Sequence, residues 1–399
     1  METAGMVSLM ELYNLPGPAI HYLDHAATSW PKPARVTEAI SEFLAAAGAN
    51  PGRGGHRMSL EASRRVLAAR ERIAQRFGAG NPDHVVFTAN ATESLNIAIN
   101  GLLGPGSHAI SSVMEHNSVL RPLFELQRER GVEISLARAS GAGLIEPDEI
   151  RKLLRPNSRL IVITHASNVV GTINPVDEIA KIARETGVPL LVDAAQTSGI
   201  LDIDISAQLI DLLAVSGHKG LEGPTGIGFL LFRKPLPLHP LKQGGTGSQS
   251  ERLEQPTFLP DLLESGTLNT VGIAGLMGAM EDVTPEVAHE SWERQKWLTE
   301  LFLAGLRSVR DARLLGLPTA EGRLSVFSLD FPGQDLARIA QILDDEFGVL
   351  TRVGLHCAPL AHKALNSFPQ GTIRISFGRT TDEDDVTAAL DALARFSRE

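Results

Sequence analysis

Segments with a helical repeat of apolar residues alternate with short apolar runs between about residue 60 and residue 235. Apolar side chains recur every three or four positions over 60–79, 92–103 and 175–187, which is typical of amphipathic helices. The runs 159–168 and 188–196 are nearly continuous Val, Ile and Leu, as in strands that are covered on both faces. Further segments of the same kind are strands at 84–90 and 211–219 and a strand followed by a helix over 108–131. The alternation predicts an open α/β sheet with helices on both faces.

The pattern changes after residue 236. A glycine-rich stretch, 243–256, precedes a long helical stretch that runs through 291–309. The chain ends in a mixture of strand and helix patterns, at 322–333, 335–350, 372–378 and 382–396. We therefore expect a large domain over residues 21–275 and a small α+β C-terminal domain over 276–399, which the N-terminal segment 1–20 joins.

Composition and charge narrow the choice of partners. The 399 residues are 43% hydrophobic and 21% charged, as in ordinary globular proteins, and the formal net charge is −10. This charge argues against nucleic acid or an anionic membrane as the main partner, because both require clustered Lys and Arg. The sequence shows no signal-peptide pattern and no apolar run of membrane-spanning length. We expect a cytoplasmic protein whose partners are small molecules or other proteins, and we assign no metal ligands.

The single cysteine, Cys357, cannot form an intramolecular disulfide, which fits a reducing compartment. A lone cysteine is either a buried core residue or a reactive thiol. From its residue type alone, burial in the core is the favoured interpretation.

Polar residues follow several of the predicted strands, where ligands of open α/β sheets bind. Asp193 ends one apolar run, and Lys219 follows the next run 26 residues later. On their own, these two residues are equally well explained as a structural ion pair. The junction of strand and helix at residues 90–92 supplies free N–H groups for an anion, although Thr92 is also an acceptable helix N-cap. Ser216 and His218 add further donors near the lysine.

An anion site, an aspartate and a lysine at neighbouring strand ends suit pyridoxal 5'-phosphate. The lysine forms a Schiff base with the cofactor, the carboxylate keeps the ring nitrogen protonated, and the phosphate sits at the helix N-terminus. This chemistry explains why a buried lysine occurs at this position.

At this point nearly the whole chain resembles a known family, the class V aminotransferases of pyridoxal-phosphate fold type I, and specifically their cysteine desulfurase and selenocysteine lyase branch. The motifs that carry the resemblance are "YLDHAATSWPKP", "NPGRGGHRMS", "TANATESLN", "EHNSVLRP", "SNVVGTINP", "VDAAQTSG", "SGHKGLEGPTGIGFL", "ESGTLNT", "RVGLHCAP" and "RISFG". The resemblance implies a mainly parallel seven-stranded sheet between helices, with a small α+β C-terminal domain. It also implies a homodimer in which the two subunits complete each other's sites.

The resemblance implies a role for each motif residue. Lys219 would hold the cofactor aldehyde, Asp193 would pair with the ring nitrogen, and Gln196 would bond near the ring hydroxyl. His116 would stack on the ring, although a solvated loop histidine is the plainer interpretation of that residue. Asn168 would lie between the ring substituent and the substrate. The phosphate ligands would be Ala91, Thr92, Ser216 and His218, with Thr267 reaching over from the second subunit. The substrate contacts would be Arg374, as the carboxylate clamp, with Asn168, Ala27 and Arg53, although Arg53 equally fits a structural role in a turn.

The resemblance also changes the interpretation of Cys357. Its segment "RVGLHCAPLAH" resembles the desulfurase loop whose cysteine attacks the substrate sulfur and becomes a persulfide. An exposed loop before Pro359 is a poor place for a core residue, so the nucleophile is now the favoured interpretation. His356 and Arg352 are the candidates to favour the attacking thiolate.

The resemblance therefore implies conversion of L-cysteine to L-alanine, with the sulfur left on Cys357 for an acceptor protein or thiol. Lys219 and His116 would shuttle the protons. Selenocysteine lyase is the nearest alternative, because "EHNS" and residues 243–256 depart from the usual desulfurase pattern near the substrate or partner surface. Transamination or epimerisation would need Lys219 but not Cys357. A catalytically silent cofactor-binding or sulfur-carrier protein would not need to retain every expected chemical residue, as this chain does.

Overall fold

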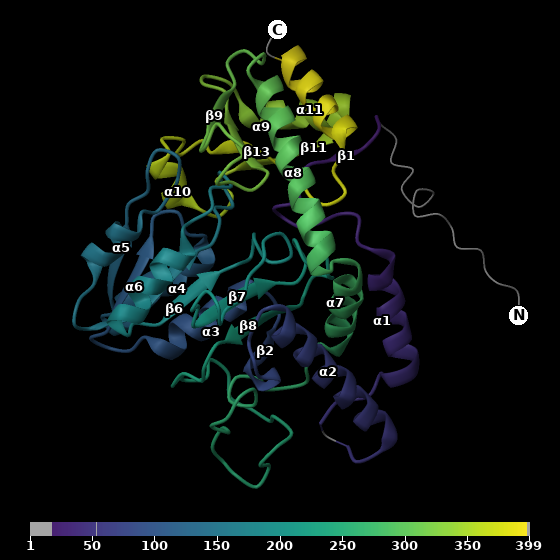
Figure 1. Ribbon diagram of the computed structural model, residues 1–399, viewed down its shortest axis with the longest axis vertical. Helices are drawn as coiled ribbons and strands as arrows, with labels where there is room; N and C mark the ends of the chain where they lie inside the picture. The colour runs from purple at the N-terminus through teal and green to yellow at the C-terminus, as the bar shows by residue number, and fades with distance from the viewer. Residues whose placement is uncertain (1–17, 53, 397–399) are drawn as a thin grey trace, which may run out of the picture.

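The computed structural model describes residues 18–52 and 54–396, and Figure 1 shows their arrangement. A large sheet with its helices forms one end of the molecule, and a small sheet with α9 and α11 forms the other. The long helix α8 (Pro285–Leu306) runs between the two ends. Within the described ranges, no helix has the length and apolar character needed to cross a membrane.

The large sheet has seven strands in the order β2-β8-β7-β6-β5-β3-β4, which confirms the predicted α/β sheet. Only β8 runs against its two neighbours, and the other pairings are parallel. The strands are β2 (Val85–Thr88), β3 (His108–Ser112), β4 (Glu133–Ala137), β5 (Ser158–Thr164), β6 (Leu190–Asp193), β7 (Leu212–Ser216) and β8 (Gly228–Phe232).

Helices cover both faces of this sheet, because alternate side chains of each strand point to opposite faces. One face packs against residues of α2 (Arg57–Arg76), α5 (Pro147–Leu153), α6 (Val176–Thr186) and α7 (Thr270–Asp282). The other face packs against α3 (Ala91–Leu102) and α4 (Asn117–Arg130). Helix α1 (Ala34–Ala47) lies outside, against α7. The central strands are therefore buried on both sides, as their continuous apolar sequence predicts.

The small sheet is antiparallel, in the order β12-β13-β10-β9. Its strands are β9 (Arg313–Leu315), β10 (Val326–Asp330), β12 (Arg352–Gly354) and β13 (Thr372–Ser376). The helices beside it are α9 (Leu336–Phe347), α10 (Pro359–Ala364) and α11 (Glu383–Phe396). Its core includes Phe302, Phe327 and Phe377, whose rings lie 4.6–5.6 Å apart.

The N-terminal residues that are described lie against the small sheet's side of the molecule. β1 (His21–Tyr22) pairs in parallel with β11 (Val349–Leu350), and Leu23 belongs to the small core. The expected boundary after residue 275 falls inside α7, whose buried Ile273 and Leu276 pack in the core of the large sheet. The division into domains stays a prediction.

A buried ion pair fastens the loop before α7 to the edge of the large sheet. Glu264 Oε2 lies 2.5 Å from Arg70 Nη2, and both side chains are only 7% exposed. The other oxygen, Oε1, accepts a 2.6 Å hydrogen bond from the N–H of Phe87 in the edge strand β2. Glu264 therefore links α2, β2 and the segment that carries Thr267.

We expect Glu264→Ala to lower the free energy of unfolding by about 3–5 kcal/mol, because it leaves the Arg70 charge buried without its partner. The control is Glu61→Ala, which removes an exposed i,i+4 pair with Arg65 and costs about 0.3–0.5 kcal/mol. Urea unfolding followed by fluorescence measures both variants. Equal losses in the two variants would contradict the role of Glu264.

Candidate active site

A cavity of about 220 Å³ lies beyond the carboxyl ends of the parallel strands. Its lining contains nine residues that the sequence singles out as cofactor contacts: Ala91, Thr92, His116, Asn168, Asp193, Gln196, Ser216, His218 and Lys219. The topology explains the gathering, because β5, β6 and β7 are consecutive parallel neighbours, with Thr164 opposite Asp193 and Asp193 opposite Ala214.

The N-terminus of α3 forms one wall of the cavity. Asn90, not Thr92, is the N-cap, and its side chain accepts from the N–H of Glu93 at 3.0 Å, so the N-cap interpretation of Thr92 is wrong. Within the described part of the chain, the N–H groups of Ala91 and Thr92 have no acceptor. A Cβ on Gly228 would lie 2.8 Å from the Asn90 Cα, so glycine is needed for β8 to approach this helix end. The free N–H groups and the helix dipole favour an anion here.

Asp193 and Lys219 face the same cavity. Burial raises the pKa of Asp193, although a 2.9 Å hydrogen bond from the Ala195 N–H and the charge of Lys219 both act in the opposite direction. Burial lowers the pKa of Lys219 to about 8, against the opposing effect of Asp193. No described residue forms a hydrogen bond with the Lys219 ammonium. The lysine is therefore a recessed amine close to neutrality, free to react.

His116 is held in one orientation by the start of α4. It is the N-cap of this helix, and its Nδ1 accepts from the N–H of Ser118 at 3.0 Å. Burial, followed by the charge of Lys219, lowers the pKa of His116 to about 4. The ring is therefore neutral at pH 7, and because Nδ1 is the acceptor, Nε2 carries the proton.

Arg374 lies behind Asn168, on β13. Its Nη1 donates to the Asn168 carbonyl oxygen at 3.2 Å, and its Nη2 lies 2.6 Å from Asp24 Oδ1. The side chain is 1% exposed, and its Nε has no hydrogen-bond partner in the described chain. The guanidinium is thus fixed beside the site, and its Nε–H is unused.

Cys357 lies in a short turn that is held in place by Asn168, which lines the cavity, and by Asn117. Its carbonyl oxygen accepts a 2.7 Å hydrogen bond from the N–H of Asn117, next to His116. The carbonyl oxygen of His356 accepts from Asn168 Nδ2, also at 2.7 Å. The thiol is exposed, as the sequence predicts, and Arg352 Nη2 lies 3.8 Å from Sγ.

His356 does not supply positive charge to the thiol. Its Nε2 bonds to Thr372 Oγ1 at 3.0 Å, and burial lowers its pKa to about 2. The expectation that His356 assists the thiolate is therefore wrong, because the ring is neutral and faces away into the fold. Arg352 is the neighbouring cation.

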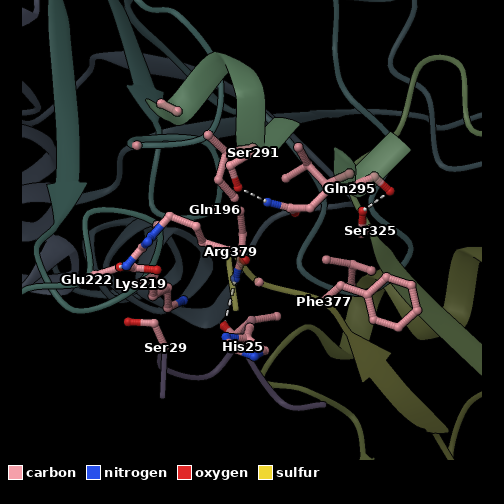
Figure 2. A pocket seen from close by; sticks show the side chains of 18 residues that line it. His25, Ser29, Gln196, Lys219, Glu222, Ser291, Gln295, Ser325, Phe377 and Arg379 are labelled. Atoms are coloured by element: carbon pink, nitrogen blue, oxygen red, sulfur yellow. Dashed lines mark hydrogen bonds and ion pairs between the residues drawn. The ribbon is translucent and has the colours of Figure 1, made fainter. Parts of the chain in front are cut away.

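The turn that carries Lys219 is fastened from two directions. The carbonyl oxygen of His218 accepts from Lys32 Nζ at 2.8 Å and from Ser29 N at 3.1 Å. Glu222 closes the turn with a 2.8 Å bond from its N–H to the Lys219 carbonyl oxygen, and Arg379 pairs with its carboxylate at 2.6 Å. Figure 2 shows a second cavity, of about 40 Å³, with Lys219 and Glu222 on one side and Gln295, Ser325 and Phe377 on the other. Lys219 thus stands between two cavities and is positioned by both ends of the chain.

Four predicted residues that the structure describes do not line this cavity: Arg374 and Cys357, described above, and Thr267 and Ala27. Thr267 is exposed, and within the described residues its hydroxyl accepts one 3.4 Å hydrogen bond, from Asn50. Ala27 is half-buried beside Asp24, to whose carbonyl oxygen its N–H donates at 3.0 Å. Arg53 lies outside the described residues, so its assignment stays a prediction.

Sequence reasoning missed Glu115, which is fully buried next to His116. Its Oε1 accepts from Ser112 Oγ at 2.6 Å and from the Thr164 N–H at 3.1 Å, and its Oε2 has no described partner. Burial raises the pKa of Glu115 to about 8. The only sequence signal is its place in "EHNS", directly after a strand. Glu115 joins β3 to β5 and so fixes the turn that ends in His116.

We expect Glu115→Gln to become progressively more stable than the parent chain as pH rises from 5 to 8. The folded chain keeps this carboxyl protonated up to about pH 8, whereas the unfolded chain ionises above its ordinary pKa of 4.5. The shifted pKa of Glu115 therefore costs no folding free energy below pH 4.5. Above that pH the cost grows to a few kcal/mol by pH 8, at about 1.4 kcal/mol per pKa unit. Thermal unfolding across pH measures the difference, with Glu71→Gln on the exposed surface of α2 as the control. A difference that does not change with pH would contradict a neutral Glu115.

Comparison with known proteins identifies the fold and its family. The model of the family described as Aminotransferase class-V matches residues 21–389. A probable cysteine desulfurase of Methanothermobacter thermautotrophicus is 35% identical over 374 residues, which cover 92% of each chain. The cysteine desulfurase IscS of Dictyoglomus turgidum is 33% identical, over 94% of this chain and 93% of its own. The apo structure of a cysteine desulfurase from Thermococcus onnurineus NA1 superposes with a TM-score of 0.88 at 31% identity, over 94% of each chain. The chain therefore belongs to the class V aminotransferase family and has the fold of its cysteine desulfurases.

Proposed function

We propose that the protein is a cysteine desulfurase, which converts L-cysteine to L-alanine and receives the sulfur on Cys357 as a persulfide. The observation that carries this proposal is the anchoring of the Cys357 turn. Its backbone is held by Asn168, which lines the cavity that Lys219 enters, and by Asn117, the neighbour of the cavity residue His116. A transaminase or epimerase has no use for an exposed thiol that is fixed at the mouth of its site.

The residues of the cavity fit pyridoxal 5'-phosphate, which we propose as the cofactor. The free N–H groups of Ala91 and Thr92, with Ser216 and His218 close by, suit the phosphate. Asp193 suits the ring nitrogen, Gln196 the ring hydroxyl, and Lys219 the aldehyde. When it is bound, the cofactor withdraws electrons from the α-carbon of the amino acid.

Substrate binding is assigned to Arg374 and Asn168. The planar guanidinium offers its donors in a fork that matches a carboxylate, and its Nε–H is unused in the described structure. A substrate carboxylate would take over part of the interaction that Asp24 now makes with Arg374.

Lys219 and His116 are assigned to proton transfer. Lys219 has its pKa lowered to about 8, so near neutral pH it both accepts and returns a proton at the α-carbon. His116 keeps Nε2–H and offers it to the substrate side of the cavity, because Ser118 occupies Nδ1. The ring thus acts as a hydrogen-bond donor and not as a cation.

The sulfur step uses the Cys357 thiolate. Its lone pair attacks the sulfur of the bound cysteine, the sulfur–sulfur bond forms, and the carbon–sulfur bond breaks. The electron pair of the broken bond stays on the carbon, which takes up a proton and becomes the methyl group of alanine. Alanine then leaves the site. Atoms balance, because cysteine plus enzyme thiol gives alanine plus enzyme persulfide.

The remaining assignments concern the second subunit, the sulfur acceptor and the alternative substrate. We propose a homodimer in which Thr267 reaches the phosphate of the second subunit, which agrees with the exposed position of Thr267 in a single chain. A sulfur-acceptor protein or thiol would remove the outer sulfur of the persulfide. Selenocysteine is the substrate of the alternative function, and a selenol leaves more readily than a thiol.

We expect Cys357→Ala to abolish alanine formation from L-cysteine while retaining the visible absorption of the bound cofactor. The retained spectrum shows that the fold and the Lys219 site are intact. Assays of alanine and sulfide, with and without reductant, measure the loss. Cys357→Ser is the isosteric control, and it should fail equally because its hydroxyl is not a sulfur nucleophile.

The same variants separate the alternatives. If Cys357→Ala still releases selenide from L-selenocysteine at the parent rate, and the parent makes little alanine from cysteine, the protein is a selenocysteine lyase. If the cofactor-loaded parent makes no alanine from either amino acid, both proposals fail.

A further inference from the structure

The surface around Cys357 carries two arginines without carboxylate partners among the described residues, although the whole chain has a net charge of −10. The side chain of Arg352, in β12, contacts the thiol at 3.8 Å and has no ion-pair partner in the part of the chain that the structure describes. Arg121, in α4, is exposed and forms no ion pair or hydrogen bond within residues 18–52 and 54–396. Both arginines lie close enough to His116 to lower its pKa by their charge. Positive charge therefore gathers around His116, whose helix begins at the Cys357 turn.

An apolar side chain accompanies the arginine on α4. Asn117, Arg121 and Phe124 are spaced i, i+4 and i+7 on α4, so they form one stripe along the helix that starts at the Cys357 carbonyl oxygen. Phe124 is 45% exposed. We call Arg121, Phe124 and Arg352 the Cys357 face. Arginine and aromatic residues with neighbouring apolar surface are enriched where proteins bind one another.

We propose that the Cys357 face is the docking surface for an acidic protein segment, whose acceptor thiol is flanked by Asp or Glu side chains. The inference rests on the proposed function, because it concerns the molecule that removes the sulfur. Opposite charge on the partner would orient it and raise the rate of productive encounter. Phe124 would supply the apolar contact that a small anion cannot use.

The sulfur transfer on this surface involves only the Cys357 persulfide and the acceptor thiolate. The acceptor thiolate attacks the outer sulfur of the Cys357 persulfide, and a new sulfur–sulfur bond forms on the acceptor. The bond to Cys357 breaks, and its electron pair returns to Cys357 as a thiolate. Arg352 lies beside that leaving sulfur and favours its negative charge.

The test loads Cys357 chemically, so that it does not depend on turnover of cysteine. Inorganic polysulfide converts the single cysteine of the holoenzyme to the persulfide. Three peptides of equal length are then compared as acceptors in separate reactions. Each has one cysteine, which is flanked by Asp and Glu, by Ser and Gln, or by Lys. Mass spectrometry follows the loss of 32 Da from the protein with time, since a sulfur atom of about that mass leaves at each transfer.

We expect the acidic peptide to react about tenfold faster than the basic peptide at low ionic strength, with the difference shrinking as salt rises. Arg121→Gln should remove most of this preference. Arg130→Gln is the matched control, because Arg130 is also exposed and unpaired in the described chain and lies nine residues further along α4, about 14 Å at 1.5 Å per residue. It should leave the preference unchanged.

Phe124→Ser separates a protein surface from a site for small anions. It should slow the acidic peptide several-fold but leave mercaptosuccinate, a small anionic thiol, unaffected. Equal rates for the three peptides, or equal losses in Arg121→Gln and Arg130→Gln, would overturn the proposal. So would a Phe124→Ser variant that treats the peptide and mercaptosuccinate alike. The proposed desulfurase function fails separately, if the enzyme forms no persulfide from L-cysteine.

Discussion

The site depends on fixing the position of one buried amine without engaging its nitrogen in an ion pair. A lysine next to a carboxylate normally forms an ion pair, which would leave it charged and unreactive. Here the backbone on both sides of Lys219 is fixed instead, by Lys32 and Ser29 on the His218 carbonyl oxygen and by Glu222 on the Lys219 carbonyl oxygen. The amine itself keeps no hydrogen bond in the described chain, so its position is set while its chemistry stays available.

This arrangement joins distant parts of the chain through the turn of Lys219. Arg379 follows β13 in the C-terminal part, and Lys32 follows β1 near the start of the described residues, yet both reach the loop after β7. Asp193 ends β6 and Lys219 lies in the turn after the neighbouring β7, whereas Arg374 lies on β13 of the small sheet and Cys357 in the turn after β12. A displacement of the small sheet would therefore be felt at the lysine through the pair of Glu222 and Arg379.

The sequence predicts what depends on strand order and motif, and it misses what depends on packing across the chain. Asp193 and Lys219 end apolar runs, so their meeting follows from parallel pairing alone. The turn of His356 toward Thr372 does not, because residues 16 positions apart meet only once β12 and β13 pair. Glu115 is hidden for the same reason, since its partner Thr164 lies on β5, and a glutamate beside a histidine otherwise indicates an exposed loop. The choice of N-cap is open in the sequence, because Asn90 and Thr92 are both good capping residues, and only the backbone decides between them.

The Cys357 turn shows how a reactive group is fixed without a rigid element beneath it. His356 and Cys357 both have left-handed backbone, with φ of 46° and 58°, which costs about 1–2 kcal/mol for each residue that is not glycine. The hydrogen bonds from Asn117 and Asn168 to the two carbonyl oxygens, with the bond of His356 to Thr372, offset this cost. Asn168 thus both lines the cavity and stabilises the turn. Together these bonds to the backbone and to the His356 ring hold the thiol beside the cavity.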